Sequence, residues 1–327
     1  MGRRRPAAAA ALDGVVVVDK AAGLTSHDVV ARVRRILSQP RSGHAGTLDP
    51  DATGVLVIGL GQGTRLLRYA TTLEKHYTGE IVLGTTTSTL DAAGEVTGTF
   101  PMGGVTLNAA RAAARSLTGP ILQVPPMVSA VRVGGRRLYE MAREGIEVER
   151  AARPVEVMRF DLEASDDPMV LRARVTCSSG TYIRVLAADL GELLGGGAHL
   201  RGLRRTAVGS FDIAQARPVD DLTPADILPV ASLVAQFAQV VVVDDETRRA
   251  IATGTVFDAT TRSRFNGFEG DGPFAVTGPA SELLAVYEGV AGGRAKPTVV
   301  LTRPTGSGPP ETRSSTTSPP GRAGSSE

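Results

Sequence analysis

Cysteine is nearly absent from this chain of 327 residues, and tryptophan is missing altogether. The single cysteine, Cys177, excludes an internal disulfide and a zinc site built on several thiolates, and it fits a reducing compartment. The four histidines lack the short spacings that metal ligands share. No apolar run approaches the roughly 20 residues of a membrane-spanning helix. These absences predict a soluble, cytoplasmic protein without a membrane partner.

Excess charge of either sign is also lacking. Lysine and arginine total 36 against 34 acidic residues, for a formal net charge of +2, which does not by itself indicate a nucleic-acid partner. The arginines nevertheless gather in three clusters whose convergence would form a phosphate-binding patch, although each alone is more typical of a solvated face. The clusters are Arg32, Arg34, Arg35 and Arg41; Arg132, Arg136, Arg137 and Arg143; and Arg201, Arg204 and Arg205.

Apolar periodicity predicts alternating helices and strands over residues 13–222. Strands are expected at 15–18, 55–58, 77–83, 155–163, 169–177 and 198–213, and helices at 25–37, 64–74, 106–118 and 181–194. Thr25 and Asp28 have the spacing of a capping box at the start of the first helix.

The remaining chain predicts a second, smaller domain. Short strands among glycines indicate a β-rich domain over residues 223–302. Residues 1–12 are expected to form a flexible tail. Residues 303–327, rich in Ser, Thr, Pro and Gly, offer almost nothing to bury and are expected to be disordered.

Residues 41–54 place one imidazole, two carboxylates, three glycines and a proline directly before the apolar strand at 55–58. An irregular loop docked on a core strand is a common way to present a reactive side chain. Turn chemistry favours the same residue types. Composition alone therefore leaves Asp49 open between a reactive group and an ordinary turn residue.

Six stretches in order resemble the TruB family of tRNA pseudouridine synthases and cover about residues 13–213. The sequence Gly-His-Ala-Gly-Thr-Leu-Asp-Pro at residues 43–50 resembles the family signature around its catalytic aspartate. The others are residues 19–20 with 23–30, Lys75-His76-Tyr77, residues 125–127 with 129–130 and 138–140, residues 178–191 around Gly180-Thr181-Tyr182-Ile183-Arg184, and residues 197–200 with 203–205.

The resemblance implies the fold class and the reaction. It implies an α+β pseudouridine synthase fold, with a mixed, mostly antiparallel sheet flanked by helices, and a small C-terminal domain that weakly resembles a PUA-like module. Residues 125–150 resemble a lid that covers RNA. The implied reaction isomerises uridine to pseudouridine at position fifty-five in the T-loop of tRNA, without metal or cofactor. We expect a monomer that binds the T-arm.

Three residues are implied to carry the chemistry. Asp49 resembles the catalytic carboxylate, which either attacks C1′ or abstracts a ribose proton toward a glycal. Arg184 resembles the cation that orients Asp49 and keeps it ionised. Tyr77 resembles the platform on which the extruded uracil stacks, with a hydroxyl available for proton transfer.

Further residues are expected to bind the substrate. His44 is expected to contact the nucleotide or the opened loop during base flipping. The others are Lys20 and Tyr182 as pocket-wall or orienting residues, Asp91 in an RNA-contacting loop, and Arg132, Arg204 and Arg205 at phosphates. Val128 and Arg132 depart from the family pattern, which often has an aromatic residue and a lysine there.

Two alternatives use the same fold. The chain could act as an RNA-binding chaperone that promotes tRNA folding without catalysis, although the presence of Asp49, Tyr77 and Arg184 argues against a purely non-catalytic role. A guide-RNA-dependent relative is disfavoured because the chain lacks long lysine-rich tails.

Overall fold

The computed structural model describes residues 12–129 and 131–302. Contacts divide the chain into two units, Met1–Ala238 and Gln239–Glu327. The predicted tails at 1–12 and 303–327 lie outside the described residues, apart from Leu12. The predicted boundary between residues 222 and 223 falls inside the first unit, because the segment after it returns to the sheet, where Leu228 and Val15 exchange backbone hydrogen bonds.

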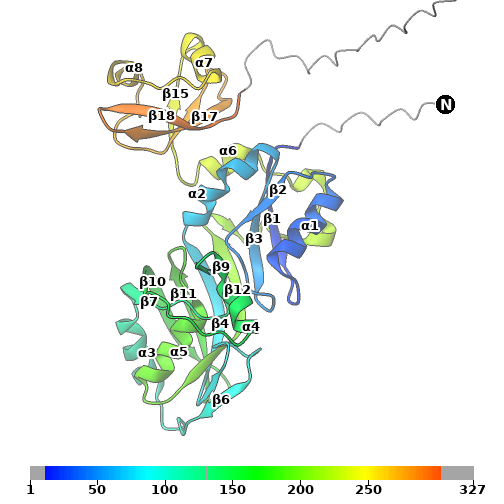
Figure 1. Cartoon of the computed structure of the whole chain (residues 1–327), viewed down its shortest axis with the longest axis vertical. Coiled ribbons are helices and arrows are strands. Elements are labelled where there is room, and N and C mark those ends of the chain that lie inside the picture. Colours follow the sequence, from blue (N-terminus) through cyan, green and yellow to red (C-terminus); the bar gives the residue numbers. More distant parts are fainter. Residues whose placement is uncertain (1–11, 130, 303–327) are drawn as a thin grey trace, which may run out of the picture. The chain divides into compact units, whose positions relative to one another are not determined.

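The first unit is built on a ten-stranded sheet (Figure 1). Its path is β14-β1-β3-β12-β4-β11-β10-β7, with β2 added to β3 and β13 to β12. The strands are β1 (Gly14–Lys20), β2 (Ser42–Ala45), β3 (Thr53–Leu60), β4 (Lys75–Leu83), β7 (Gly119–Gln123), β10 (Arg153–Ala164), β11 (Val170–Cys177), β12 (Ala198–Val208), β13 (Phe211–Asp212) and β14 (Arg217–Pro218). All pairs are antiparallel except β1 with β14 and β3 with β12, so the expected mixed, mostly antiparallel sheet is confirmed.

Helices accompany this sheet, and all but α4 lie close to its strands. They are α1 (Ser26–Ile36), α2 (Leu67–Thr72), α3 (Leu107–Ser116), α4 (Leu138–Arg143), α5 (Ile183–Leu193) and α6 (Val230–Val234), with 3₁₀ turns η1 (Gly61–Leu66), η2 (Val219–Asp221) and η3 (Pro224–Asp226). The predicted capping box at Thr25 and Asp28 is present. The helix expected at 64–74 is instead divided into η1 and α2.

Two apolar cores fix the sheet against its helices. One joins α3 and α5 to the central strands through residues such as Ala110, Leu186 and Leu200. The other joins α1 to β1 and β3 through residues such as Val29 and Ile58. The loop before β3 and the start of α5 are therefore both anchored to rigid elements.

The strand expected at 198–213 is two strands. β12 continues through Arg204 and Arg205 with two register shifts against β4. It then turns at Gly209, whose φ of +54° suits glycine, and pairs with β13. The basic pair therefore lies inside a strand of the sheet.

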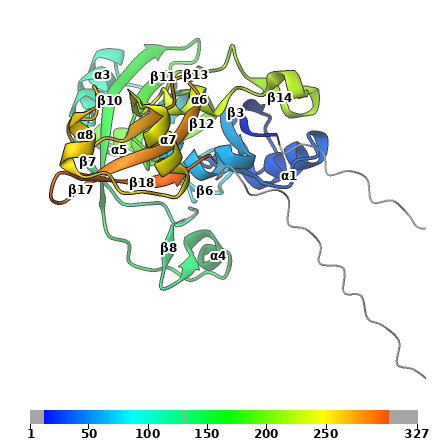
Figure 2. The same cartoon turned by 90° about the horizontal axis from the view of Figure 1, so that it is seen from above.

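The first unit also contains two small two-stranded sheets. One pairs β5 (Thr85–Thr87) with β6 (Val96–Thr99), and the other pairs β8 (Arg132–Val133) with β9 (Arg136–Arg137). Figure 2 shows β8 and α4 standing apart from the strands of the large sheet.

The second unit is β-rich, as predicted. β15 (Gln239–Val242), β16 (Phe274–Thr277), β17 (Leu283–Val290) and β18 (Arg294–Val300) form one sheet, accompanied by α7 (Asp245–Ala252) and α8 (Ala259–Ser263). Its core includes stacked Phe257 and Tyr287. Across both units, none of the helices in residues 12–129 and 131–302 has the length and apolarity to span a membrane.

Candidate active site

Asp49 lies in the connection between β2 and β3, and this loop is held from several sides. The backbone N–H of Leu48 donates to Ser26 Oγ at 3.0 Å, and Lys20 Nζ donates to the Pro50 carbonyl at 2.8 Å. At the far end, Gly54 has a φ of +101°, and a Cβ there would lie 2.1 Å from the Arg205 carbonyl oxygen. The loop conformation is thus fixed by its supports before any substrate binds.

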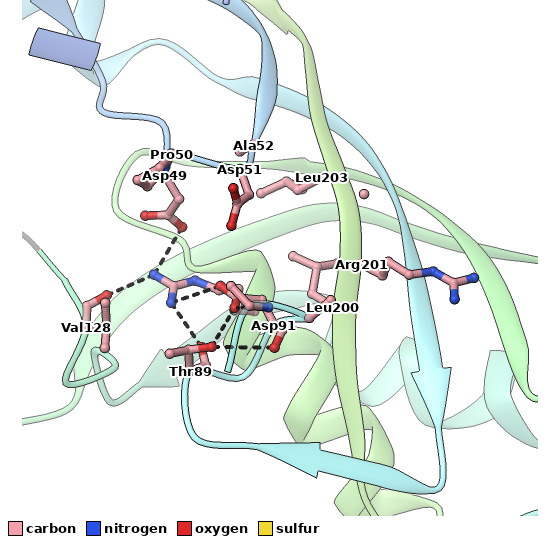
Figure 3. A pocket seen from close by; sticks show the side chains of 14 residues that line it. Asp49, Pro50, Asp51, Ala52, Thr89, Asp91, Val128, Leu200, Arg201 and Leu203 are labelled. Carbon is pink, nitrogen blue, oxygen red and sulfur yellow. Dashed lines mark hydrogen bonds and ion pairs between the residues drawn. The ribbon is translucent and has the colours of Figure 1, made fainter. Parts of the chain in front are cut away.

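Arg184 meets Asp49 at the start of α5. Its Nη2 lies 3.0 Å from Asp49 Oδ2, and its Nη1 lies 3.3 Å from Asp91 Oδ2. The same guanidinium donates to the carbonyls of Thr89 and Val128, each at 2.9 Å. Figure 3 labels the four residues that supply these acceptors, Asp49, Val128, Thr89 and Asp91. With four acceptors and a side chain 5% exposed, Arg184 has one orientation, and that orientation fixes Asp49.

The charge on Asp49 is balanced between opposing effects. Burial raises the pKa of this carboxyl, Arg184 is the largest opposing influence, and Asp91 adds to the increase. The side chain is still 43% exposed. Asp49 is therefore a more basic carboxylate than an ordinary surface aspartate, and it remains accessible to a ligand.

Tyr77 lies on β4 between β11 and β12, opposite Val175 and Arg205. Its ring is mostly buried, and burial raises the pKa of its hydroxyl while Arg205 opposes the increase. Tyr77, Asp49 and Arg184 line one cavity of about 280 Å³, called here the base cavity. The structure thus brings the three predicted catalytic residues together from a loop, a strand and a helix.

A second cavity of about 380 Å³ shares Asp49 and Arg184 with the base cavity. Asp51 and Asp91 also line it (Figure 3). The ion pair between Asp49 and Arg184 therefore borders both cavities. Asp91 lines only the second cavity and is connected to Asp49 by its ion pair with Arg184.

Tyr182 also lines the base cavity, and its backbone is clamped by Gln123. The Tyr182 N–H donates to Gln123 Oε1 at 2.9 Å, and Gln123 Nε2 donates to the Tyr182 carbonyl at 3.3 Å. This buried amide positions the residue that precedes α5. Gln123 was not predicted from the sequence, because a single glutamine at the end of a strand carries no signal.

Lys20 and His44 line neither cavity. Lys20 is buried and donates to the carbonyls of Ala21, Leu24 and Pro50, and burial lowers its pKa to about 8. The His44 ring makes an edge contact with His27 at 5.4 Å between centroids. Burial, followed by the charges of His27 and Arg205, lowers the pKa of His44 to about 4.

The three arginines predicted to bind phosphate differ in placement. Arg204 forms a bidentate ion pair with Asp19, in which Nη1 donates to Oδ1 at 3.0 Å and Nη2 donates to Oδ2 at 2.7 Å. Arg205 is buried, lines the base cavity and donates to the carbonyls of Val55 and Gly46. The backbone of Arg132 lies in β8, while its side chain lies outside the described residues.

No cluster of His, Cys, Asp and Glu within the described ranges has the arrangement of a metal site. What the site does hold is a partly exposed carboxylate, a fixed guanidinium and an aromatic ring beside a cavity. That combination suits polar chemistry on a stacked, planar ligand.

Comparison with solved structures shows the class of fold. An H/ACA RNP bound to a substrate RNA containing 2′-deoxyuridine aligns with a TM-score of 0.67 at 22% identity, over 90% of this chain and 86% of that one. An archaeal box H/ACA sRNP Nop10-Cbf5 complex aligns with a TM-score of 0.68 at 23% identity, over 90% and 88%. This chain therefore shares its fold with the aligned chains of these complexes.

Sequence comparison then gives the family. Residues 34–183 match the profile of the TruB family pseudouridylate synthase N-terminal domain, and residues 184–232 match that of the tRNA pseudouridylate synthase B C-terminal domain. The tRNA pseudouridine synthase B of Mycobacterium tuberculosis is 51% identical over 221 residues, covering 67% of this chain and 74% of the relative. That of Thermobifida fusca is 46% identical over 297 residues, covering 88% and 98%. The chain belongs to the TruB family of pseudouridylate synthases, which are isomerases, as the motifs predicted.

Proposed function

We propose that this chain converts uridine to pseudouridine in tRNA, with Asp49 as the catalytic carboxylate. The observation that carries the proposal is the 3.0 Å ion pair between Asp49 and Arg184 at the edge of a cavity lined by Tyr77. The tRNA substrate is taken from the names of the relatives. From the motif resemblance we extend it to the T-loop uridine at position fifty-five, bound through the T-arm by a monomer in the cytoplasm.

The reaction needs a carboxylate beside C1′ of the ribose. By one route Asp49 bonds to C1′ and is displaced when C5 bonds there. By the other it removes a ribose proton from C2′ and later returns it. In both, the electron pair of the N1–C1′ bond leaves with N1, C5 later loses its proton and N1 gains one. A carboxylate with a raised pKa is a better nucleophile and base, and Arg184 keeps it directed at one place.

The base must leave its stack to reach Asp49. Extrusion costs a few kcal/mol, and stacking on an aromatic ring returns roughly 1–3 kcal/mol per base. Tyr77 is suited to this because its position in the middle strands of the sheet holds the ring still. The cavity volume of about 280 Å³ leaves room for a flat base beside the ring.

Residues 125–150 would act as the lid over the bound RNA. The Val128 carbonyl accepts from Arg184, so the start of this segment touches the residue that orients Asp49. The C-terminal unit would contribute further RNA contacts as a PUA-like module.

The decisive variant is Asp49→Asn, with Asp166→Asn as the matched control. Asp166 is exposed in the hairpin between β10 and β11. We expect Asp49→Asn to form no pseudouridine while binding tRNA with unchanged affinity, and Asp166→Asn to behave as wild type. Pseudouridine would be mapped along the whole tRNA after incubation with purified protein.

Each outcome has a distinct meaning. Full activity of Asp49→Asn would refute the catalytic assignment. Product at a uridine outside the T-loop would refute the position but leave the isomerase in place. If Asp49→Asn still anneals unfolded tRNA, a chaperone activity exists beside catalysis.

A further inference from the structure

Ser129 carries a buried hydroxyl without a hydrogen-bond partner among the described residues. The residue is 6% exposed, and no described group pairs with its Oγ. Its backbone is engaged, since its N–H donates to the Met127 carbonyl at 3.0 Å. Leaving a buried hydroxyl unpaired costs on the order of 1–3 kcal/mol, and native proteins keep few such groups. A ligand group that pairs with Oγ would explain why a serine is tolerated there.

Ser129 lies beside a residue that contacts the Asp49–Arg184 ion pair. Ser129 lines the same cavity as Tyr77 and Asp49. The preceding residue, Val128, accepts at 2.9 Å from the same Arg184 Nη2 that lies 3.0 Å from Asp49. Ser129 therefore directly follows a residue that hydrogen-bonds to the arginine of the ion pair.

The two cationic side chains Lys75 and Arg205, which also line the cavity, are engaged with backbone carbonyls. Lys75 Nζ donates to Thr71 and Leu73 at 2.6 and 2.5 Å. Arg205 donates to Val55 and Gly46. The Ser129 and Thr181 hydroxyls, in contrast, are both buried without a hydrogen-bond partner among the described residues, and Ser129 is the one that directly follows a contact of Arg184.

The reaction creates a demand for such a donor. When the N1–C1′ bond breaks, its electron pair leaves with the base, and the negative charge spreads over N1, O2 and O4 of uracil. The base must then turn about its N3–C6 axis to present C5 to C1′. That rotation exchanges O2 with O4, so a donor beside C1′ faces a carbonyl oxygen before and after the turn.

We propose that Ser129 is a catalytic residue of this site that donates a hydrogen bond to the uracil carbonyl oxygen beside C1′, O2 before rotation and O4 after it. The role rests on the proposed function. The bond strengthens as the oxygen gains charge, because hydrogen bonds to charged groups are stronger than neutral ones. Ser129 therefore stabilises the cleaved state more than the bound substrate, and no proton is transferred in the step.

Three substitutions at this position test the proposal, with Ser116→Ala as control. Ser116 is exposed at the end of α3. We expect Ser129→Ala to slow single-turnover conversion about 10- to 100-fold with tRNA affinity unchanged within about twofold. Ser129→Cys, a weak donor, should be similarly slow, and Ser129→Thr should stay within about threefold of wild type. Ser116→Ala should match wild type.

A stability measurement separates this role from a structural one. Because the Ser129 hydroxyl has no described partner to lose, Ser129→Ala should melt at the wild-type temperature or slightly above. A clear fall in melting temperature together with the fall in rate would assign Ser129 to the scaffold and overturn the proposal. So would a Ser129→Ala rate within twofold of wild type.

Substrate analogues identify the atom that Ser129 contacts. Sulfur accepts hydrogen bonds weakly, so with 2-thiouridine at the target position the penalty of Ser129→Ala should shrink to about threefold or less. With 2′-deoxyuridine the penalty on binding or turnover should be as for uridine. A penalty that disappears with 2′-deoxyuridine instead would show a ribose contact and refute the carbonyl assignment. Failure of wild-type protein to form pseudouridine would refute the proposed function itself, a separate result.

Discussion

Replacing Arg184 by methionine removes a cation that contacts both Asp49 and Asp91. Its Nη atoms lie 3.0 and 3.3 Å from the two carboxylates, and burial already raises the pKa of Asp49. Without the guanidinium, Asp49 still feels the like charge of Asp91 and has lost its largest opposing influence. We expect the pKa of Asp49 to rise further.

The size of the change follows from the geometry. An opposite charge at this distance lowers a carboxyl pKa by about 1–3 units. The Asp49 side chain is 43% exposed, so solvent screening weakens this effect. Asp49 must be ionised to act, so activity in the variant should need a higher pH than in wild type. Loss of orientation should lower the maximal rate about 100-fold or more.

The assay is single-turnover release of the C5 hydrogen from labelled tRNA between pH 5 and 9. Arg184→Lys separates charge from geometry, because an ammonium restores the charge but not the fork that reaches four acceptors. The acid side of the pH–rate profile of Arg184→Lys should stay near that of wild type, while its maximal rate remains low. Arg111→Met on α3, where the side chain donates to the Leu162 carbonyl, is the control for the substitution. If the acid side of the pH–rate profile of Arg184→Met coincides with that of wild type, Arg184 does not keep Asp49 ionised.

Three further predictions concern the supports of the site. Gln123→Leu removes the two hydrogen bonds between the Gln123 amide and the Tyr182 backbone. The free energy of unfolding measured in urea should therefore fall by about 2–4 kcal/mol. An unchanged unfolding midpoint would contradict the role of Gln123 in holding Tyr182. Tyr77→Phe keeps the stacking ring and should convert tRNA within about tenfold of wild type, while Tyr77→Leu should fall about 10- to 100-fold further; equal losses would assign the hydroxyl to proton transfer. His44 has a folded pKa of about 4, below its ordinary value of 6.5, so the unfolded chain takes up the proton first and stability is lost as pH falls from 6.5 toward 4. In wild type, the free energy of unfolding measured in urea should be lower at pH 4.5 than at pH 7, and His44→Leu should reduce that difference by roughly 2 kcal/mol. A pH dependence of stability that does not change in the variant would contradict the lowered pKa of His44.

Local patterns in the sequence were sufficient for most elements. Alternation predicted β4, β10 and β11, because side chains of a half-buried strand change faces at every residue. The pair Thr25 and Asp28 predicted the start of α1, because a capping box uses only neighbouring residues. The ordered motifs predicted the family, and the profile matches confirm it.

The basic residues show where local patterns stopped being informative. Arg204 and Arg205 are adjacent in sequence and both were expected at phosphates. On β12 they face opposite ways, so Arg204 meets Asp19 while Arg205 is buried behind the loop that holds Gly46. Charge alone could not distinguish them, because the outcome depends on which strand lies on each side.

The sequence by itself predicted the longer elements and determined the family, and it singled out the three side chains proposed for catalysis. The tertiary structure decided that Asp49, Tyr77 and Arg184 share one cavity, that Gln123 clamps the start of α5, and that the Ser129 hydroxyl has no described partner. These facts depend on strand order and register across a sheet whose neighbours are far apart in the chain. Burial and pairing are properties of that arrangement, and no stretch of sequence contains them.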